Sequence, residues 1–163
     1  MTYIFYQLKR IITPYRVDGL LANIILLIPR IIAGFLLAFV YAPVKFGTPW
    51  SPKSLELGLF EVADWFVIRV TEFGAPFNFM PEVFSWSAGF TEAFGGILLL
   101  LGLNTRITAF FITCVMAITI YFREWDDTWS ILPTFLFFCI GLFYLGFGSG
   151  KYGLDYWYAN RKF

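Results

Sequence analysis

Four stretches of the chain are apolar enough and long enough to cross a membrane as helices. A helical span needs roughly 20 mostly apolar residues to cross a hydrocarbon core about 30 Å thick. The predicted spans cover residues 20–44, 84–103, 105–122 and 131–147. The pattern therefore predicts an all-α membrane protein with four transmembrane helices, folded as a single transmembrane domain over residues 1–163.

The short connections predict how the spans are arranged. Only a few residues join the second span to the third, and a short loop joins the third to the fourth. Connections of this length force neighbouring helices to run in opposite directions. The expected architecture is therefore an antiparallel four-helix bundle.

The connection between the first two spans, residues 45–83, is long and has a helical pattern of its own. Its apolar residues recur at helical spacing between positions 55 and 73. Ser51-Pro52 is a plausible start and Gly74, with Pro76 after it, a plausible stop. The pattern predicts an additional amphipathic helix over about residues 52–73, lying on the outer face of the bundle.

The distribution of Lys and Arg predicts the orientation in the membrane. Basic residues precede the first span, lie at the turn between the second and third, and follow the fourth, whereas the other two connections are acidic. Because positive charge concentrates on the cytoplasmic side, residues 1–19 are expected to be cytoplasmic or interfacial. The same rule places the tail, residues 148–163, in the cytoplasm and residues 45–83 outside.

The composition excludes several classes of protein. Apolar residues make up 59% of the chain and charged residues only 14%, whereas a soluble domain carries roughly 25% charged residues. A soluble globular protein, a disordered chain and a nucleic-acid binder are therefore excluded. The chain has no histidine and two cysteines, which removes imidazole metal sites and iron–sulfur clusters. No metal or bound cofactor is predicted from the residues.

Two charged residues fall inside the predicted spans. Arg30 lies about ten residues into the first span and Glu92 about eight into the second. A charge at mid-depth costs about 2.5–3.5 kcal/mol on insertion scales, so it normally faces the bundle and has a partner. An Arg30–Glu92 pair is feasible at these depths. It would either hold two helices in register or form part of a substrate or proton site.

The neighbours of these charges share their helix faces. Helical spacing places Arg30, Gly34 and Ala38 on one face of the first span, together with two further polar residues near its outer end. Small residues beside a charge let another helix approach and enclose it. The residues of this candidate intramembrane polar site are Arg30, Tyr41, Lys45 and Glu92.

The two cysteines leave two interpretations open. Cys114 and Cys139 lie at similar depth on adjacent predicted spans, so they are candidates for a thiol pair. Equal depth does not bring their Cβ atoms within the ~4.5 Å that a disulfide requires. Buried cysteine is also commonly a small apolar residue.

Several of these residues recur in an order that is typical of one family. An Arg, a Gly and a Lys in the first span are followed by a Glu-x-x-Gly-Gly run ending in Gly-Leu-x-x-Arg, and a Gly-x-Gly-Lys-Tyr-x-Leu-Asp segment follows the last span. The positions are Arg30, Gly34, Lys45, Glu92, Gly95, Gly96, Gly102, Arg106, Gly148, Gly150, Lys151 and Asp155. In these positions the chain resembles the DoxX family of small four-span bacterial membrane proteins.

The resemblance implies a four-helix bundle in the bacterial cytoplasmic (inner) membrane. It also implies redox associations, since the family includes a subunit of thiosulfate:quinone oxidoreductase and partners of thiol and oxidative-stress enzymes. We expect an accessory or structural subunit of a redox-associated complex, in contact with the lipid bilayer and other membrane subunits. The alternative is a quinone-linked oxidoreductase subunit in which Arg30, Lys45 and Glu92 line a pocket. A small transporter is the third possibility.

Overall fold

The computed structural model describes residues 15, 17–122 and 128–160, and within them the chain is helical, with no strand. Short π-helical and 3-10 segments lie between α2 and α3, and a 3-10 turn lies between α3 and α4. Their bounds are α2 (Leu20–Phe35), α3 (Asp64–Glu72), α4 (Pro81–Leu101), α5 (Thr105–Phe122), α6 (Thr128–Phe147) and α7 (Leu154–Asn160).

Three helical segments of the described chain are long and apolar enough to cross a membrane. The first is Leu20–Val44, in which the π-helix η1 (Leu36–Tyr41) and the 3-10 turn η2 (Ala42–Val44) extend α2. The other two are α4 and α5. These segments agree with the first three predicted spans to within a few residues. The apolar part of α6, Ile131–Phe147, coincides with the fourth predicted span but is shorter.

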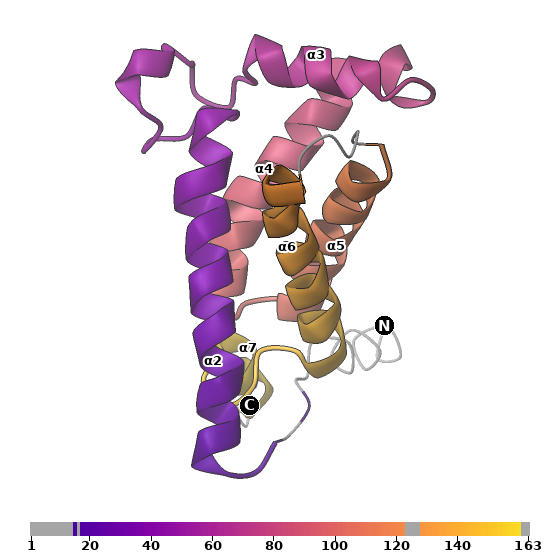
Figure 1. Ribbon diagram of the computed structural model, residues 1–163. Helices are drawn as coiled ribbons and strands as arrows, with labels where there is room; N and C mark the ends of the chain where they lie inside the picture. Colours follow the sequence, from indigo (N-terminus) through magenta and orange to yellow (C-terminus); the bar gives the residue numbers. More distant parts are fainter. Residues whose placement is uncertain (1–14, 16, 123–127, 161–163) are drawn as a thin grey trace, which may run out of the picture.

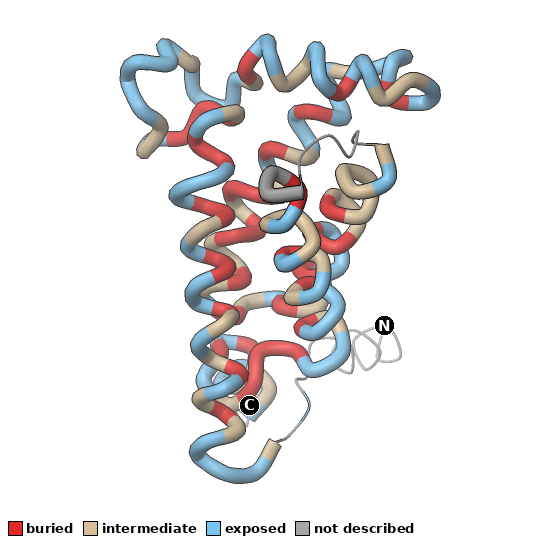
Figure 2. Tube along the Cα trace, in the orientation of Figure 1, coloured by how far each residue is buried: buried red, intermediate tan, exposed pale blue. Residues whose placement is uncertain are grey.

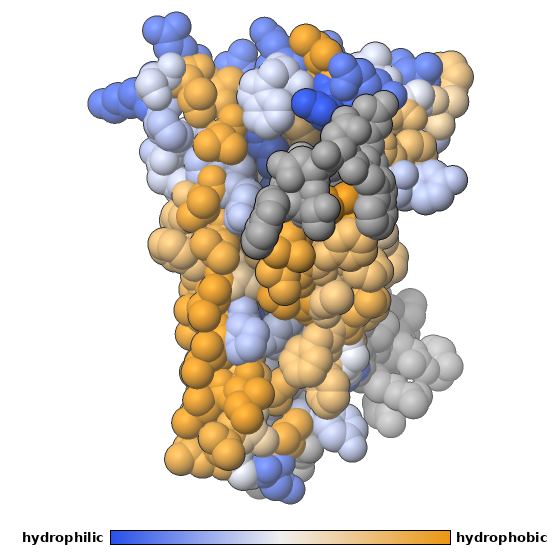
Figure 3. All heavy atoms as spheres, in the orientation of Figure 1, coloured by the Kyte–Doolittle hydropathy of each residue, from blue (hydrophilic) through white to orange (hydrophobic). Residues whose placement is uncertain are grey.

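The long helices stand side by side, and α3 lies across one end of them (Figure 1). The α5 helix packs most extensively against α6, and α4 contacts both α2 and α5. Their inward faces meet in a core that includes Leu37, Leu99, Ile112 and Tyr144. Buried residues follow these inward faces in Figure 2, and Figure 3 shows apolar surface along the helix flanks. Apolar flanks of this kind suit a lipid environment.

Small residues set the close approach of α2 and α4. A Cβ placed on Gly34 would lie 2.6 Å from Gly96 O, and one placed on Gly96 would lie 2.7 Å from Ala38 N. Because a side chain at either glycine would collide with backbone, the two helices can touch only where these residues are small. The sequence placed Gly34 and Ala38 on one helix face, and the structure brings that face against Gly96.

The amphipathic helix predicted over residues 52–73 is wrong in its first half. Only Asp64–Glu72 forms an α-helix, which ends before Gly74 (φ 76°). The preceding residues instead pair with the end of the first span: Gly47 N–H donates to Glu61 O (2.7 Å), and Ala63 N–H donates to Lys45 O (3.0 Å). These long-range hydrogen bonds satisfy backbone groups that the helix would have used, so periodicity alone gave the wrong start.

The tail contains a helix that the sequence reasoning did not predict. After a turn at residues 148–153, the chain forms α7 and returns toward the α4–α5 connection, where Asp155 N–H donates to Gly102 O (2.9 Å). Two predictions lie outside the described residues. They concern the interfacial segment that precedes residue 15 and the acidic loop at residues 123–127.

Candidate functional site

Glu92 forms an ion pair with Lys45 inside the bundle. Glu92 lies in the middle of α4, and Lys45 immediately follows η2 at the end of the first apolar segment. The Lys45 Nζ atom is 2.8 Å from Glu92 Oε1 and 2.6 Å from Glu92 Oε2. The two side chains are only 16% and 5% exposed. Each charge therefore compensates the other in a largely desolvated position.

Arg30 has different partners, and the predicted Arg30–Glu92 pair is wrong. The Arg30 guanidinium donates to two backbone carbonyls of the turn after α6, Ser149 O at 2.5 Å and Tyr152 O at 3.1 Å. That turn folds back beneath α2 because Gly148 and Gly150 adopt left-handed conformations (φ 72° and 69°). Arg30 therefore finds acceptors at its own end of the bundle, and Glu92 is left to Lys45.

The surroundings of Arg30 are packed shut. The residue is 1% exposed, and a Cβ placed on Gly102 would lie 2.7 Å from both the guanidinium carbon and Gly153 Cα. The adjacent Asp155 carboxylate accepts hydrogen bonds from the backbone N–H groups of Asn104 (2.6 Å) and Thr105 (2.9 Å). It thereby caps the N-terminus of α5. This end of the bundle is held together by side chain–backbone contacts.

The remaining motif positions lie in the same end of the bundle or along the helix seams. Arg106 donates to Gly146 O (3.0 Å), and Lys151 Nζ lies 3.1 Å from the exposed carboxylate of Asp18. Gly95 faces Thr108 and Ile112 across the seam between α4 and α5. These contacts join elements of the fold.

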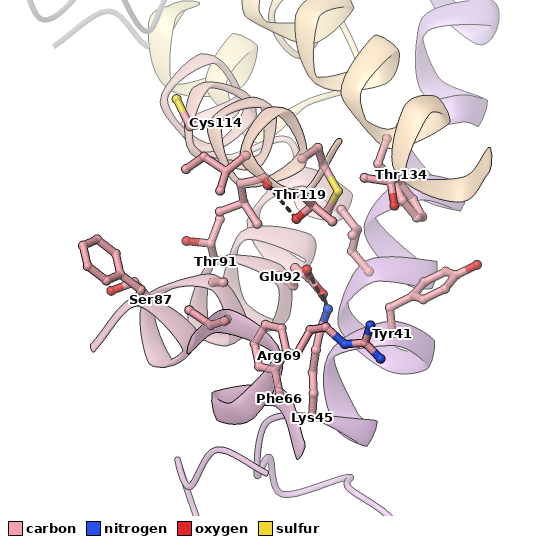
Figure 4. Close-up of a pocket in the computed structure, with 18 of the residues that line it drawn as sticks. Tyr41, Lys45, Phe66, Arg69, Ser87, Thr91, Glu92, Cys114, Thr119 and Thr134 are labelled. Atoms are coloured by element: carbon pink, nitrogen blue, oxygen red, sulfur yellow. Dashed lines mark hydrogen bonds and ion pairs between the residues drawn. The ribbon is translucent and has the colours of Figure 1, made fainter. Parts of the chain in front are cut away.

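A pocket of about 450 Å³ lies beneath α3, among η1, α4, α5 and α6. Figure 4 shows the Lys45–Glu92 pair within it, with Tyr41 and Arg69 close by. Aromatic side chains form much of the remaining wall, and several side chains with hydroxyl groups also line it. The aromatic residues are Trp65, Phe66, Phe73, Phe77, Phe84, Phe111 and Phe137, and the hydroxyl residues other than Tyr41 are Ser87, Thr91, Thr119 and Thr134.

The polar end of the pocket has more positive than negative groups. Lys45 Nζ lies 5.0 Å from the centre of the Phe66 ring, within cation–π range. Arg69 also lines the pocket. Its contact with Glu72 is 3.8 Å long, and both side chains are more than 60% exposed. Because an exposed pair of this length is weak, the guanidinium remains available to a ligand.

Of the candidate polar residues, the structure brings Tyr41, Lys45 and Glu92 together in the pocket wall and places Arg30 elsewhere. The structure does not bring the two cysteines together as a thiol pair. Both thiols are free; Cys114 lines the pocket, whereas Cys139 is exposed and is not among the lining residues. The described residues contain no group of three or more His, Cys, Asp or Glu side chains able to hold a metal ion.

Sequence reasoning missed Arg69 and the pocket that it lines. One signal was available, since Arg69 follows Phe66 by three residues and precedes Phe73 by four. This spacing places its side chain on the apolar face of the helix, where a charge is unusual. The pocket beneath that face is enclosed by five segments. Helical periodicity describes each segment by itself and does not show how the segments are arranged in space.

The fold and the site define a class: an all-helical membrane protein in which a buried ion pair faces an aromatic-lined pocket. A model of the DoxX family matches residues 25–125, which is more than half of the chain, and the chain belongs to that family. The match confirms the resemblance inferred from the motif residues. A comparison with curated proteins gave no match, and neither did a comparison with solved structures.

Proposed function

We propose that the chain is a subunit of a redox-associated membrane complex and that it binds a quinone-class ligand in the pocket beneath α3. The observation that carries the proposal is the Lys45–Glu92 pair, which is almost fully buried yet lines a cavity of about 450 Å³. A buried ion pair that served packing alone would need no space beside it. Membership of the DoxX family supports the redox association.

The pocket suits a flat aromatic molecule that carries carbonyl groups. Its volume lies within the roughly 300–1,000 Å³ of small-molecule sites. The rings of Phe66 and Phe73 provide aromatic surface on the α3 side. Lys45 and Arg69 carry only hydrogen-bond donors, and a carbonyl oxygen is a pure acceptor. The donors and the ligand's acceptors therefore complement each other.

The residues of the pocket have separable roles in this proposal. A bound quinone supplies the redox chemistry by taking up electrons together with protons. The Lys45 ammonium orients one carbonyl oxygen of the quinone. The Glu92 carboxyl group transfers a proton to or from that same oxygen. The α3 helix covers the pocket and limits the access of water. Partner subunits supply the electrons.

We propose further that α6 is a fourth span, so that the helices form an antiparallel bundle in the inner membrane of a bacterium. Two contacts support this arrangement: Tyr15 N–H donates to Phe147 O (2.9 Å), and Asp155 N–H donates to Gly102 O (2.9 Å). The first joins the chain before α2 to the end of α6. The second joins the tail to the α4–α5 turn. Arg106 and Lys151 lie at this end, which favours a cytoplasmic location for both termini.

A purely accessory subunit is the second candidate, and the outer surface of α3 favours it. Ile68 on this helix is 60% exposed and does not line the pocket. Large apolar side chains at a polar end of a protein often mark an interface. In this alternative the helix docks a partner and the pocket has no ligand.

Equilibrium dialysis of the full chain in lipid nanodiscs against tetramethylbenzoquinone separates the two candidates. We expect saturable binding, and we expect Glu92→Gln and Lys45→Met each to weaken it by about tenfold or more, since each removes a charged partner. Lys151→Met is the matched control, because it removes a lysine–carboxylate contact outside the pocket. Absence of binding to the unmodified chain, or equal binding by all variants, would contradict the ligand site and leave the accessory role.

A further inference from the structure

The helices α4 and α5 are in contact in the part of their interface around Gly95. A Cβ placed on Gly95 would lie 3.4 Å from Thr108 Cγ2 and 3.7 Å from Ile112 Cγ1. These are ordinary packing distances, so the two helices are in contact at this level. Nothing larger than a methyl group fits between them here.

The outer end of the same interface is closed by aromatic rings. The Phe77 ring centre lies 4.9 Å from that of Phe84 and 5.1 Å from that of Phe122. Phe73 also stacks on Phe122, with 5.6 Å between the ring centres. These contacts tie the segment after α3 to the start of α4 and the end of α5.

Between these two closures, side chains that line the pocket also reach the outer surface. Phe111 is 53% exposed, Ser87 is exposed, and Thr91 and Cys114 are partly exposed. All four line the pocket. We call them the lateral window. Figure 4 shows Ser87, Thr91 and Cys114 on the side of the pocket away from Tyr41.

On the opposite side of the pocket, η1 and α6 are in contact at the level of Tyr41. The Tyr41 and Phe137 rings meet edge to face, with 5.4 Å between their centres, and Phe137 is buried. This contact joins η1 to α6. Tyr41 therefore lies on the η1 side of the pocket, and the lateral window lies on the side of α4 and α5.

The lateral window lies at a depth where a membrane protein faces hydrocarbon. Thr91 is ten residues from the start of α4 at Pro81, which corresponds to roughly 15 Å along the helix. The helices α4 and α5 that flank it are both apolar enough to span a membrane. An opening at this depth admits molecules dissolved in the lipid and excludes those that are only soluble in water.

The geometry points to a ligand with a hydrocarbon chain, whose ring lies at the Lys45–Glu92 pair and whose chain leaves through the lateral window into the lipid. Thr91 and Glu92 are adjacent on α4, so a ring at Glu92 has its substituent beside the window. This inference rests on the proposed quinone-class ligand and adds the chain and its route.

The test compares two ligands and two pairs of variants in lipid nanodiscs. The ligands are a fully substituted benzoquinone with one decyl chain and tetramethylbenzoquinone, which has the ring alone. Thr91→Trp fills the lateral window, and Val83→Trp is its control, since Val83 is exposed on α4 outside the pocket. Cys114→Trp and Cys139→Trp form the second pair, one inside the window and one outside.

Because the chain lies in lipid in both the free and the bound quinone, we expect the unmodified protein to bind the two quinones with similar affinity when concentrations are expressed per volume of lipid. Thr91→Trp and Cys114→Trp should weaken binding of the chain-bearing quinone at least about tenfold more than binding of the ring alone, because the indole blocks the route of the chain, and the two controls should show no such difference. Equal behaviour of window and control variants toward the chain-bearing quinone would overturn the inference while the ring still binds. If neither quinone binds, the proposed function fails and the window has no such ligand. Phospholipid bound in place of the quinone chain would also overturn it.

Discussion

The run of helix from Leu20 to Val44 and the residue after it carry two buried cations with opposite surroundings. Arg30, ten residues after Leu20, is 1% exposed and donates to carbonyl oxygens of a glycine-rich turn. Lys45, directly after Val44, faces the carboxylate of Glu92 and a pocket of about 450 Å³. Both charges are expensive in an apolar setting, and each is compensated by a different kind of partner.

The two kinds of partner indicate two roles. Arg30 stabilises the fold, whereas the Lys45–Glu92 pair belongs to the candidate binding site. The carbonyls around Arg30 belong to a turn that Gly102 and Gly153 allow to close tightly over the guanidinium. No ligand fits there, so the charge serves to fix the tail against α2. The Lys45–Glu92 pair has open space beside it, and the Lys45 ammonium has further N–H groups with which it can donate to a ligand. A buried charge indicates a binding site only when a cavity accompanies it.

Arg30→Met should produce the largest loss of stability. The variant leaves the buried carbonyl oxygen of Ser149 without its donor and removes the donor to the partly buried carbonyl oxygen of Tyr152. We expect the free energy of unfolding to fall by about 3 kcal/mol or more. Thermal unfolding in mild detergent measures this as a lower melting temperature and a lower yield of monodisperse protein. Lys151→Met, which breaks an exposed contact at the same end, should change the stability by less than about 0.5 kcal/mol.

Gly102→Ala should have the next largest effect because two costs combine. Gly102 has φ 68°, and an added Cβ would meet the Arg30 guanidinium and Gly153. The left-handed conformation alone costs roughly 1–2 kcal/mol for a residue with a Cβ. Gly74→Ala is the matched control, since Gly74 has φ 76° and nothing within 4 Å of its added Cβ. The excess loss at Gly102 measures the crowding around Arg30; equal melting temperatures would show that the turn can relax.

Asp155→Asn should have a smaller effect at the same end of the bundle. The Asp155 carboxylate accepts from two backbone N–H groups at the start of α5, one at each oxygen. An amide loses the charge and keeps only one acceptor oxygen, so one of the two N–H groups loses its partner. We expect a loss of about 1 kcal/mol, typical of a weakened N-cap. Chemical unfolding monitored by tryptophan fluorescence would detect it. An unchanged midpoint would mean that the carboxylate contributes no more than its shape.

The apolar pattern predicted the helical segments well because each depends on its own residues. The third predicted span and α5 both cover residues 105–122, and the helical run through Val44 ends where the first span was expected to end. The sequence also indicated the close approach at Gly34, since helix periodicity places Gly34 and Ala38 on one face of the first span.

The parts that could not be predicted depend on segments far apart in the chain. Arg30 and Ser149 are separated by 119 positions, so no spacing along α2 indicates that the tail supplies its partner. The start of α3 was misplaced because Gly47 and Ala63 form hydrogen bonds across the connection. The pocket requires several helices to be positioned at once. Of the polar residues that line it, only Tyr41, Lys45 and Glu92 were among the candidates from the sequence.

Replacing the Lys45–Glu92 pair by apolar residues of similar size distinguishes a binding role of the pair from a structural one. In the double variant Lys45→Met with Glu92→Leu, neither charge is left unpaired, and such replacements are often neutral for stability. If the pair binds the ligand, we expect a melting temperature close to that of the unmodified chain and a loss of quinone binding of about tenfold or more. A collapse of stability like that of Arg30→Met, or quinone binding that survives the change, would contradict the binding role.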